Sequence, residues 1–375
     1  MFVEGNLEKA TSGVYKSAIN KSSTTHNLVI GAGLAGCTVA RRLQKRGESF
    51  RIIGSSAMPA AFDVAAGIIN PVTGRWMTKS WRFDNFAAEA ERFYREIEKE
   101  LSIEIYHPIP EARFCLNAED AKRAQRRIRN PRYANVLGGF TPKGEAHPAI
   151  QDEYGSFHIV GAAYVDLPKL VNALRAAFNS HGHLQDELFE HSKLSKQTNG
   201  WLYQDVVYRR VIFCEGAALT KNPWFGQLPL APAKGETLLC RCKNLELPMQ
   251  LIHHRKWILP YANGRFRIGA TYDESDLSED PTDTAAGELL SGFDAATTEP
   301  HQPEVVKHLA GIRPGTQDAH PFLGQHPQQL GLFIMNGLGS KGTSLAPTLS
   351  RELLEHIFEG IPLHKEADIA RLSCD

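Results

Sequence analysis

The amino-acid sequence lacks net charge, cysteine pairs at metal-site spacing and long apolar runs. Its 42 basic and 42 acidic residues cancel, so no long-range field favours a nucleic-acid or acidic membrane partner. The six cysteines are scattered, and Cys240 and Cys242 lack the C-x-x-C spacing of zinc and redox sites. No apolar run approaches the length of a membrane span. We expect a cytoplasmic protein with incidental thiols, no metal site, no nucleic-acid partner and no membrane span.

The N-terminal residues, 1–25, mix Ser, Thr, Lys and Asn and contain no apolar core. This composition differs from that of a signal peptide, and it predicts a flexible tail. The length of 375 residues favours two domains and allows ample buried core.

One stretch organises the rest of the chain. A short apolar run, 28–30, leads into Gly31, Gly33 and Gly36, spaced G-x-G-x-x-G, then into a helical pattern and a second strand over 49–53. Gly31 permits a tight turn, Gly33 lets a pyrophosphate approach the backbone, and Gly36 lets the helix pack against the strand. An ordinary α/β turn would not need all three glycines. The unit therefore predicts dinucleotide binding, with phosphate at the helix N-terminus.

The acidic residue that usually binds the adenosine ribose is missing. Its place, about 20 residues after the first glycine, is occupied by Gly54, followed by Ser55 and Ser56. Either serine hydroxyls or backbone groups hold the ribose, or the site tolerates a 2′-phosphate. This unit alone does not distinguish FAD, NAD and NADP.

A charged helix is predicted near 118–129, with three arginines towards its end. Arg126, Arg127 and Arg129 suggest a nucleic-acid surface, but Glu119 and Asp120 balance them within the same segment. We therefore favour a solvated helix face.

The remaining chain predicts two kinds of sheet. Hairpin-spaced strands between 231 and 275, with the turn signal Asn263-Gly264, indicate an antiparallel sheet. A polar region, 284–309, is predicted to be helical. The last block, with a strand at 332–335, a glycine-rich turn at 337–343 and a closing helix, repeats the opening order of strand, turn and helix.

With these blocks in place, the chain resembles the D-amino acid oxidase superfamily of FAD-dependent flavoproteins, and among them the glycine oxidases. The resemblance runs from about 27 to 358. The matching segments follow the family's order and are 65–68, 161–166, 214–217, 267–271 and 311–324. The resemblance implies FAD rather than NADP, bound non-covalently, because no cysteine stands where related covalent enzymes attach flavin.

The resemblance also implies the site residues. Carried over position by position, the family's flavin contacts beyond the three glycines fall on Leu34, Ala35, Gly54, Ser55, Gly67, Ile68, Ile69, the backbone of Leu194, and Leu338, Gly339, Ser340, Lys341, Gly342, Thr343 and Ser344. Backbone N–H groups at the start of the closing helix would stabilise the negative charge of reduced flavin.

Two arginines are candidate catalytic residues. Arg313 matches the family arginine that pairs with a substrate carboxylate, for which a guanidinium fork is well shaped. The alternative is an arginine that ties its loop to the sheet. Arg267 stands where related sarcosine oxidases place a lysine that promotes the oxygen reaction, although glycine oxidases carry no charge there.

The implied function is an FAD-dependent amine or amino acid oxidase or dehydrogenase, with oxygen or an unknown acceptor. It would oxidise the C–N bond of a small substrate by hydride transfer, giving an imine that hydrolyses. One alternative is the FAD oxidoreductase that removes a carboxymethyl group from a tRNA uridine, which 338–342 also resemble. Another is a non-catalytic flavin-binding module.

The expected fold class is α/β, or α+β overall. A discontinuous Rossmann-like FAD-binding domain would comprise 26–71, 158–230 and 310–375, and an antiparallel-sheet substrate domain would comprise 72–157 and 231–309.

Overall fold

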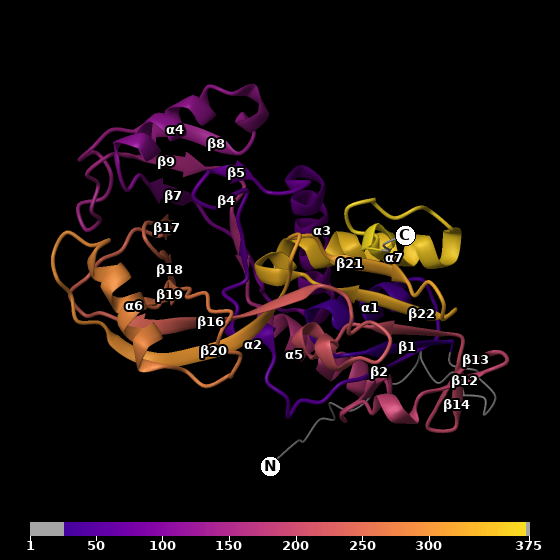
Figure 1. The fold of residues 1–375 in the computed structure, drawn as a ribbon. Coiled ribbons are helices and arrows are strands. Elements are labelled where there is room, and N and C mark those ends of the chain that lie inside the picture. The colour runs from indigo at the N-terminus through magenta and orange to yellow at the C-terminus, as the bar shows by residue number, and fades with distance from the viewer. Residues whose placement is uncertain (1–25, 373–375) are drawn as a thin grey trace, which may run out of the picture.

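The computed structural model describes residues 26–372, and two large sheets dominate the fold (Figure 1). The predicted tail, 1–25, lies outside the described residues. The two sheets lie side by side, and the chain enters each of them more than once.

The first sheet has six strands, of which five are parallel and the last is antiparallel. In spatial order they are β11 (Leu184–Gln185), β2 (Phe50–Ile53), β1 (Asn27–Ile30), β15 (Arg210–Phe213), β22 (Leu332–Asn336) and β21 (Phe322–Gln325). All four residues of β1 are buried, as expected for a central strand of a parallel sheet covered on both faces.

Alternate side chains of these strands enter two different cores. On one face, Val29 and Ile52 pack in a large cluster with four helices, α1 (Leu34–Lys45), α3 (Phe83–Leu101), α5 (Leu167–Ser180) and α7 (Gly342–Glu359). On the other face, Leu28 and Ile53 pack beneath a three-stranded meander and a short helix: β12 (Ser195–Gln197), β13 (Gly200–Tyr203), β14 (Val206–Tyr208) and η3 (Gly216–Lys221).

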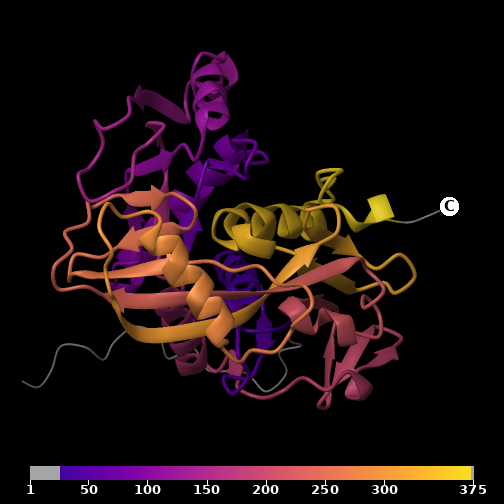
Figure 2. The same cartoon turned by 60° about the vertical axis from the view of Figure 1, so that its left-hand side comes forward.

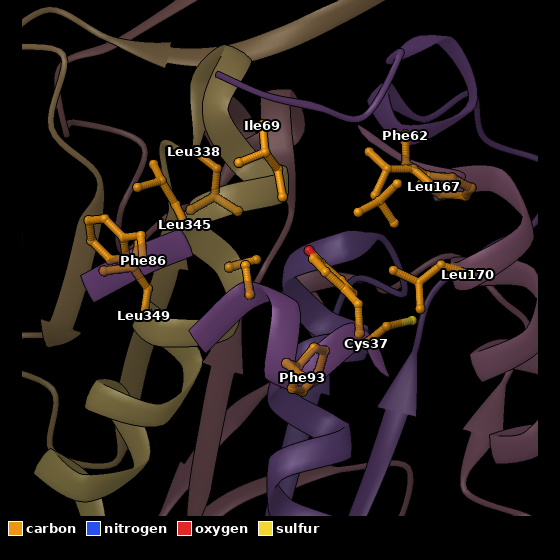
Figure 3. Packing of buried hydrophobic residues seen from close by; sticks show 14 of the residues in the cluster. Cys37, Phe62, Ile69, Phe86, Phe93, Leu167, Leu170, Leu338, Leu345 and Leu349 are labelled. Atoms are coloured by element: carbon orange, nitrogen blue, oxygen red, sulfur yellow. The ribbon is translucent and has the colours of Figure 1, made fainter. Parts of the chain in front are cut away.

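Figure 3 shows part of the larger core. Leu345 and Leu349 of α7 lie beside Phe86 of α3, while Phe62 lies beside Leu167 of α5. The core thus joins helices that are far apart in the sequence, and it supports the edge of the sheet where α1 and α7 begin.

The second sheet has eight strands and is mostly antiparallel. In order they are β20 (Glu304–Thr316), β16 (Leu230–Arg241), β19 (Arg265–Gly269), β18 (Trp257–Pro260), β17 (Leu251–His253), β7 (Glu111–Phe114), β9 (Ser156–Ile159) and β8 (Leu137–Thr141). Helix α6 (Asp283–Asp294) lies across one face, where Leu289 and Phe293 pack on Ile258 and Ile268 (Figure 2).

The prediction of helix throughout 284–309 is wrong in its second half. Helix α6 ends at Asp294, and Glu304 already begins β20. Residues 304–307, Glu-Val-Val-Lys, are all exposed although their backbone pairs with β16, so the polar side chains of Glu304 and Lys307 belong to an exposed strand end.

The smaller elements complete the fold. They are β3 (Ile68–Ile69), β10 (Ala163–Val165) and β6 (Tyr106–Pro108) in one sheet, β4 (Val72–Thr73) and β5 (Thr78–Lys79) in a hairpin, the helices α2 (Ala61–Val64) and α4 (Ala118–Ile128), and the 3-10 helices η1 (Pro131–Tyr133), η2 (His191–Lys193), η4 (Gly339–Lys341) and η5 (Ile369–Leu372). Within 26–372, no helix is both long and apolar enough to cross a membrane. The predicted class, α/β with an antiparallel sheet, is confirmed.

We expect His254 to make stability depend on pH. Burial lowers the pKa of this histidine from 6.5 to about 4, and its Nδ1 has no partner among the described residues. Between these values the unfolded chain binds the extra proton, so stability falls as pH falls. Between pH 7 and pH 4, His254 alone should lower the free energy of unfolding by about 3 kcal/mol. Denaturant unfolding of the wild type and of His254→Gln should show this difference, and equal pH slopes would contradict it.

Candidate functional site

Each glycine of the first turn has its own physical reason. Gly31 has φ +100°, and a Cβ there would lie 2.3 Å from the carbonyl oxygen of Cys214. A Cβ on Gly36 would lie 1.7 Å from the carbonyl oxygen of Gly31, so the helix could not start where it does. A Cβ on Gly33 would meet nothing closer than the Phe62 ring at 3.9 Å. Glycine at position 33 therefore keeps the backbone open to a ligand.

A second glycine-rich turn, 338–344, lies against the first. It leads from β22 through η4 into α7, and a Cβ on Gly342 would lie 3.4 Å from the side chain of Leu34. Neither α1 nor α7 has a side-chain cap or an acid in its first turn. Their first N–H groups are therefore available to an anionic ligand. Burial lowers the pKa of Lys341, which has no ion pair among the described residues.

A third segment, α2 with β3, lies next to these turns. Gly67 has φ +68°, and a Cβ there would lie 1.9 Å from the carbonyl oxygen of Val165. On its other side, the segment meets β20, where a Cβ on Gly311 would lie 2.9 Å from Val64. The structure thus brings together the predicted contacts at 31–36, 67–69 and 338–344.

The position of the missing ribose-binding acid, Gly54, has no room for a side chain. A Cβ there would lie 2.5 Å from the backbone nitrogen of Ala32. One strand further out, Asp186 follows β11 and accepts hydrogen bonds from the hydroxyl and, at 2.6 Å, the N–H of Ser56. These bonds lower the pKa of Asp186, and Nη2 of Arg175 lies 3.6 Å from the carboxylate. The Asp186 carboxylate therefore lies at the edge of the sheet where β2 ends, although no acid follows β2 itself.

We expect Asp186→Asn to weaken FAD binding about tenfold, as for the loss of one hydrogen bond to a charged group. Binding of FMN, which has no adenosine, should not change. Titration of the apoprotein with both flavins measures the effect, and Glu187→Gln, at the half-buried neighbour, is the matched control. Equal losses for FAD and FMN would contradict an adenosine contact.

Leu194 lies apart from the other predicted contacts. Its side chain is buried on the sheet face opposite the four helices, with Leu28 and Ile30. Its N–H donates to the carbonyl oxygen of His191 at 3.1 Å. Its contact with the cofactor stays a prediction.

Arg313 lies on β20 with its guanidinium over Gly235, where a Cβ would lie 1.9 Å from Nη2. Nη1 donates to the carbonyl oxygens of Lys234 at 3.3 Å and Thr271 at 3.1 Å. The ring centroid of Tyr272 lies 5.9 Å away. Burial lowers the pKa of Arg313, opposed by Tyr272, and no acid among residues 26–372 forms an ion pair with it. The Nε and Nη2 edge is free for a carboxylate.

Arg267 lies on the same face of the sheet as Arg313. Their partners on β16 are Leu239 and Ala233, an even separation along the strand. Nη1 of Arg267 donates to the carbonyl oxygens of Val64 at 3.4 Å and Ala65 at 3.1 Å, and its buried Nε has no described partner. Arg267 therefore ties the sheet to the segment before Gly67.

This arrangement defines a dinucleotide-binding protein whose second sheet packs against the 64–67 segment. The open backbone at Gly33, the two uncapped helix starts and the glycine at 67 fit a large anionic, planar ligand. The chain belongs to the family of FAD dependent oxidoreductases, whose model matches residues 27–356. It is therefore an enzyme that uses FAD as its redox cofactor.

Individual relatives agree with the family. The chain is 26% identical over 354 residues to glycine oxidase from Pseudomonas aeruginosa, covering 88% of this chain and 93% of that one. It is 25% identical to the bifunctional protein of tRNA 5-methylaminomethyl-2-thiouridine biosynthesis from Hahella chejuensis, covering 89% of this chain and 57% of that one. Among solved structures, glycine oxidase from Geobacillus kaustophilus matches with a TM-score of 0.77 at 22% identity, over 93% and 98% of the two chains.

Sequence reasoning missed Asp186 and Arg175. Nη2 of Arg175 donates to the carbonyl oxygen of Gly54 at 3.4 Å. The available signals were an acid directly after a strand of the parallel sheet and an arginine bordering the apolar stripe of α5, which consists of Leu167, Leu170, Val171, Leu174 and Phe178.

FAD should be released by acid precipitation, leaving colourless protein. The cysteines of 26–372 are free, and all except the half-buried Cys242 are buried. Burial raises the pKa of Cys37, in the first turn of α1, to about 12, so it is not a reactive thiolate. Yellow colour that stays on the precipitate would contradict non-covalent binding.

Proposed function

We propose that this enzyme oxidises the C–N bond of a small amine or amino acid and that water then hydrolyses the imine product. The observation that carries this proposal is Arg313, a half-buried cation with a free guanidinium edge on the sheet face that meets the 64–67 segment. A guanidinium fork suits a carboxylate. The glycine oxidase relatives and iminodiacetate oxidase from Chelativorans sp. BNC1, which matches with a TM-score of 0.75 at 23% identity over 91% and 98% of the two chains, support a carboxylated amine.

Bound FAD supplies the hydride acceptor of this reaction. The residues of this chain hold and orient the substrate and the cofactor. Arg313 would position the substrate carboxylate, and the N–H groups at the start of α7 would stabilise negative charge on the flavin. Such a step depends on positioning more than on a strong side-chain base.

Anaerobic titration of the holoenzyme with an amine panel tests the proposal. The panel should pair carboxylated amines, such as glycine, N-methylglycine and iminodiacetate, with amines that lack the carboxylate. We expect the flavin absorbance to bleach with at least one carboxylated compound. A flavin that dithionite bleaches but no amine reduces would leave the flavin-binding module as the better hypothesis. Reoxidation by air then distinguishes an oxidase from a dehydrogenase.

A second candidate is the removal of a carboxymethyl group from a tRNA uridine. The similarity to the tRNA biosynthesis protein covers most of this chain, although the chain spans about half of that protein. The carboxymethylamine of such a uridine is an N-substituted glycine, so Arg313 suits both substrates. Bleaching by 5-carboxymethylaminomethyluridine, with none by free amino acids, would favour this second function.

A further inference from the structure

The hairpin β4–β5 and helix α4 form a cationic cleft that is separate from the glycine-rich turns. Its volume is about 270 Å³, and its lining residues are Thr78, Lys79, Arg127, Asn130, Arg132 and Tyr133. In Figure 1, α4 lies at the top of the molecule, away from α1 and α7. The proposed oxidation does not use this cleft.

Two arginines of the cleft carry uncompensated charge. Arg127 places its guanidinium 5.0 Å from the ring centroid of Tyr133, and Nη2 donates to the Trp76 carbonyl oxygen at 3.5 Å. Its Nε is buried without a described partner. Neither Arg127 nor Arg132 forms an ion pair with a described acid, whereas Lys79 pairs with Asp84 at 2.8 Å.

The neighbouring acids do not neutralise these charges. Of the two acids that seemed to balance the helix, Asp120 accepts from Arg123 at 2.8 Å, and Glu119 forms no ion pair with a described residue. Lys122, Arg126 and Arg129 are exposed at i, i+4 and i+7, on one helix face. None of the three has an ion pair within the described part of the chain.

We propose that the cleft binds a phosphate group, held by Arg127 and Arg132 with further donors from Lys79, Thr78 and Asn130. Two guanidinium groups without a carboxylate partner match a phosphate dianion better than a carboxylate. The phosphate belongs either to a small ligand or to a nucleic-acid strand, for which the exposed stripe on α4 would contact neighbouring phosphates.

Calorimetric titration of the FAD-loaded protein at low salt tests the proposal, because bound FAD excludes phosphate from the dinucleotide site. The probes are inorganic phosphate and a single-stranded RNA 12-mer. We expect Arg127→Gln and Arg132→Gln each to weaken binding about tenfold. Arg209→Gln, which removes an exposed and unpaired arginine elsewhere, should change neither affinity. Arg132 is exposed, so its variant should fold even if Arg127→Gln does not.

The outcomes of these titrations distinguish the hypotheses. Binding of phosphate that needs Arg132 supports the site with a small ligand. Binding of RNA that needs Arg132, and that also weakens in Arg126→Gln, supports the site with a strand. Failure of both probes to bind, or equal affinity in Arg132→Gln and Arg209→Gln, overturns the proposal. The amine titration does not involve these residues, so the proposed oxidation can stand or fall separately.

Discussion

Replacement of Arg313 by alanine should remove most of the reduction of FAD by a carboxylated amine. The variant leaves the substrate carboxylate without its cation in a site where the guanidinium is largely buried, which costs about 2–5 kcal/mol. The rate constant for reduction divided by the substrate dissociation constant should fall about 30- to 4,000-fold. Anaerobic stopped-flow measurement of flavin bleaching gives this ratio, and FAD content and melting temperature should stay close to those of the wild type.

Three comparisons separate substrate binding from a structural role. Arg313→Lys keeps the charge but loses the two-pronged geometry, so it should recover only part of the rate. The matching amine without a carboxylate should be oxidised almost equally by wild type and variant. Arg255→Ala, at an exposed arginine in the turn between β17 and β18, is the arginine control. Equal losses for both compounds, or loss of FAD, would mean that the bonds to Lys234 and Thr271 are the main role of Arg313.

Gly33→Ala should weaken FAD binding and leave the fold intact, whereas Gly36→Ala should disrupt both FAD binding and the fold. A Cβ at Gly33 meets no atom within 3.9 Å, so the apoprotein should keep its melting temperature. That Cβ would occupy the space of the pyrophosphate and displace one or two charge-assisted hydrogen bonds, about 3 kcal/mol or a hundredfold in affinity. At Gly36 the Cβ would overlap the carbonyl oxygen of Gly31 at 1.7 Å, and the βαβ unit should not close.

Far-ultraviolet circular dichroism of the apoproteins and fluorescence titration with FAD measure the two effects. Gly139→Ala, at an exposed glycine with open space around it, is the matched control for a glycine-to-alanine change. If Gly33→Ala bound FAD as tightly as the wild type, the first turn would not be the pyrophosphate site.

The positions of Gly31 and Gly36 were predictable because two of their constraints are local, whereas the close approach of Gly31 to the carbonyl oxygen of Cys214 joins distant segments. The turn from β1 into α1 needs its positive φ and close contact within a few residues, and the apolar run before it marks the strand. The family resemblance of 311–324 made Arg313 a candidate, and its contact with a substrate stays a prediction. Its free guanidinium edge was not predictable, because the carbonyls that hold it come from β16 and from Thr271, distant in sequence.

The sequence by itself determined the dinucleotide-binding turn, the fold class and the family, because short-range backbone geometry and residue pattern carry that information. Only the tertiary structure decided which side chains share an edge or a face. It placed Asp186 beside the end of β2, where a Cβ at Gly54 would meet Ala32. It also gathered uncompensated arginines around one cleft of a chain with no net charge. Net charge sums over the whole chain, whereas binding depends on charges within a few ångströms, and those distances arise only when the strands pair and the helices pack.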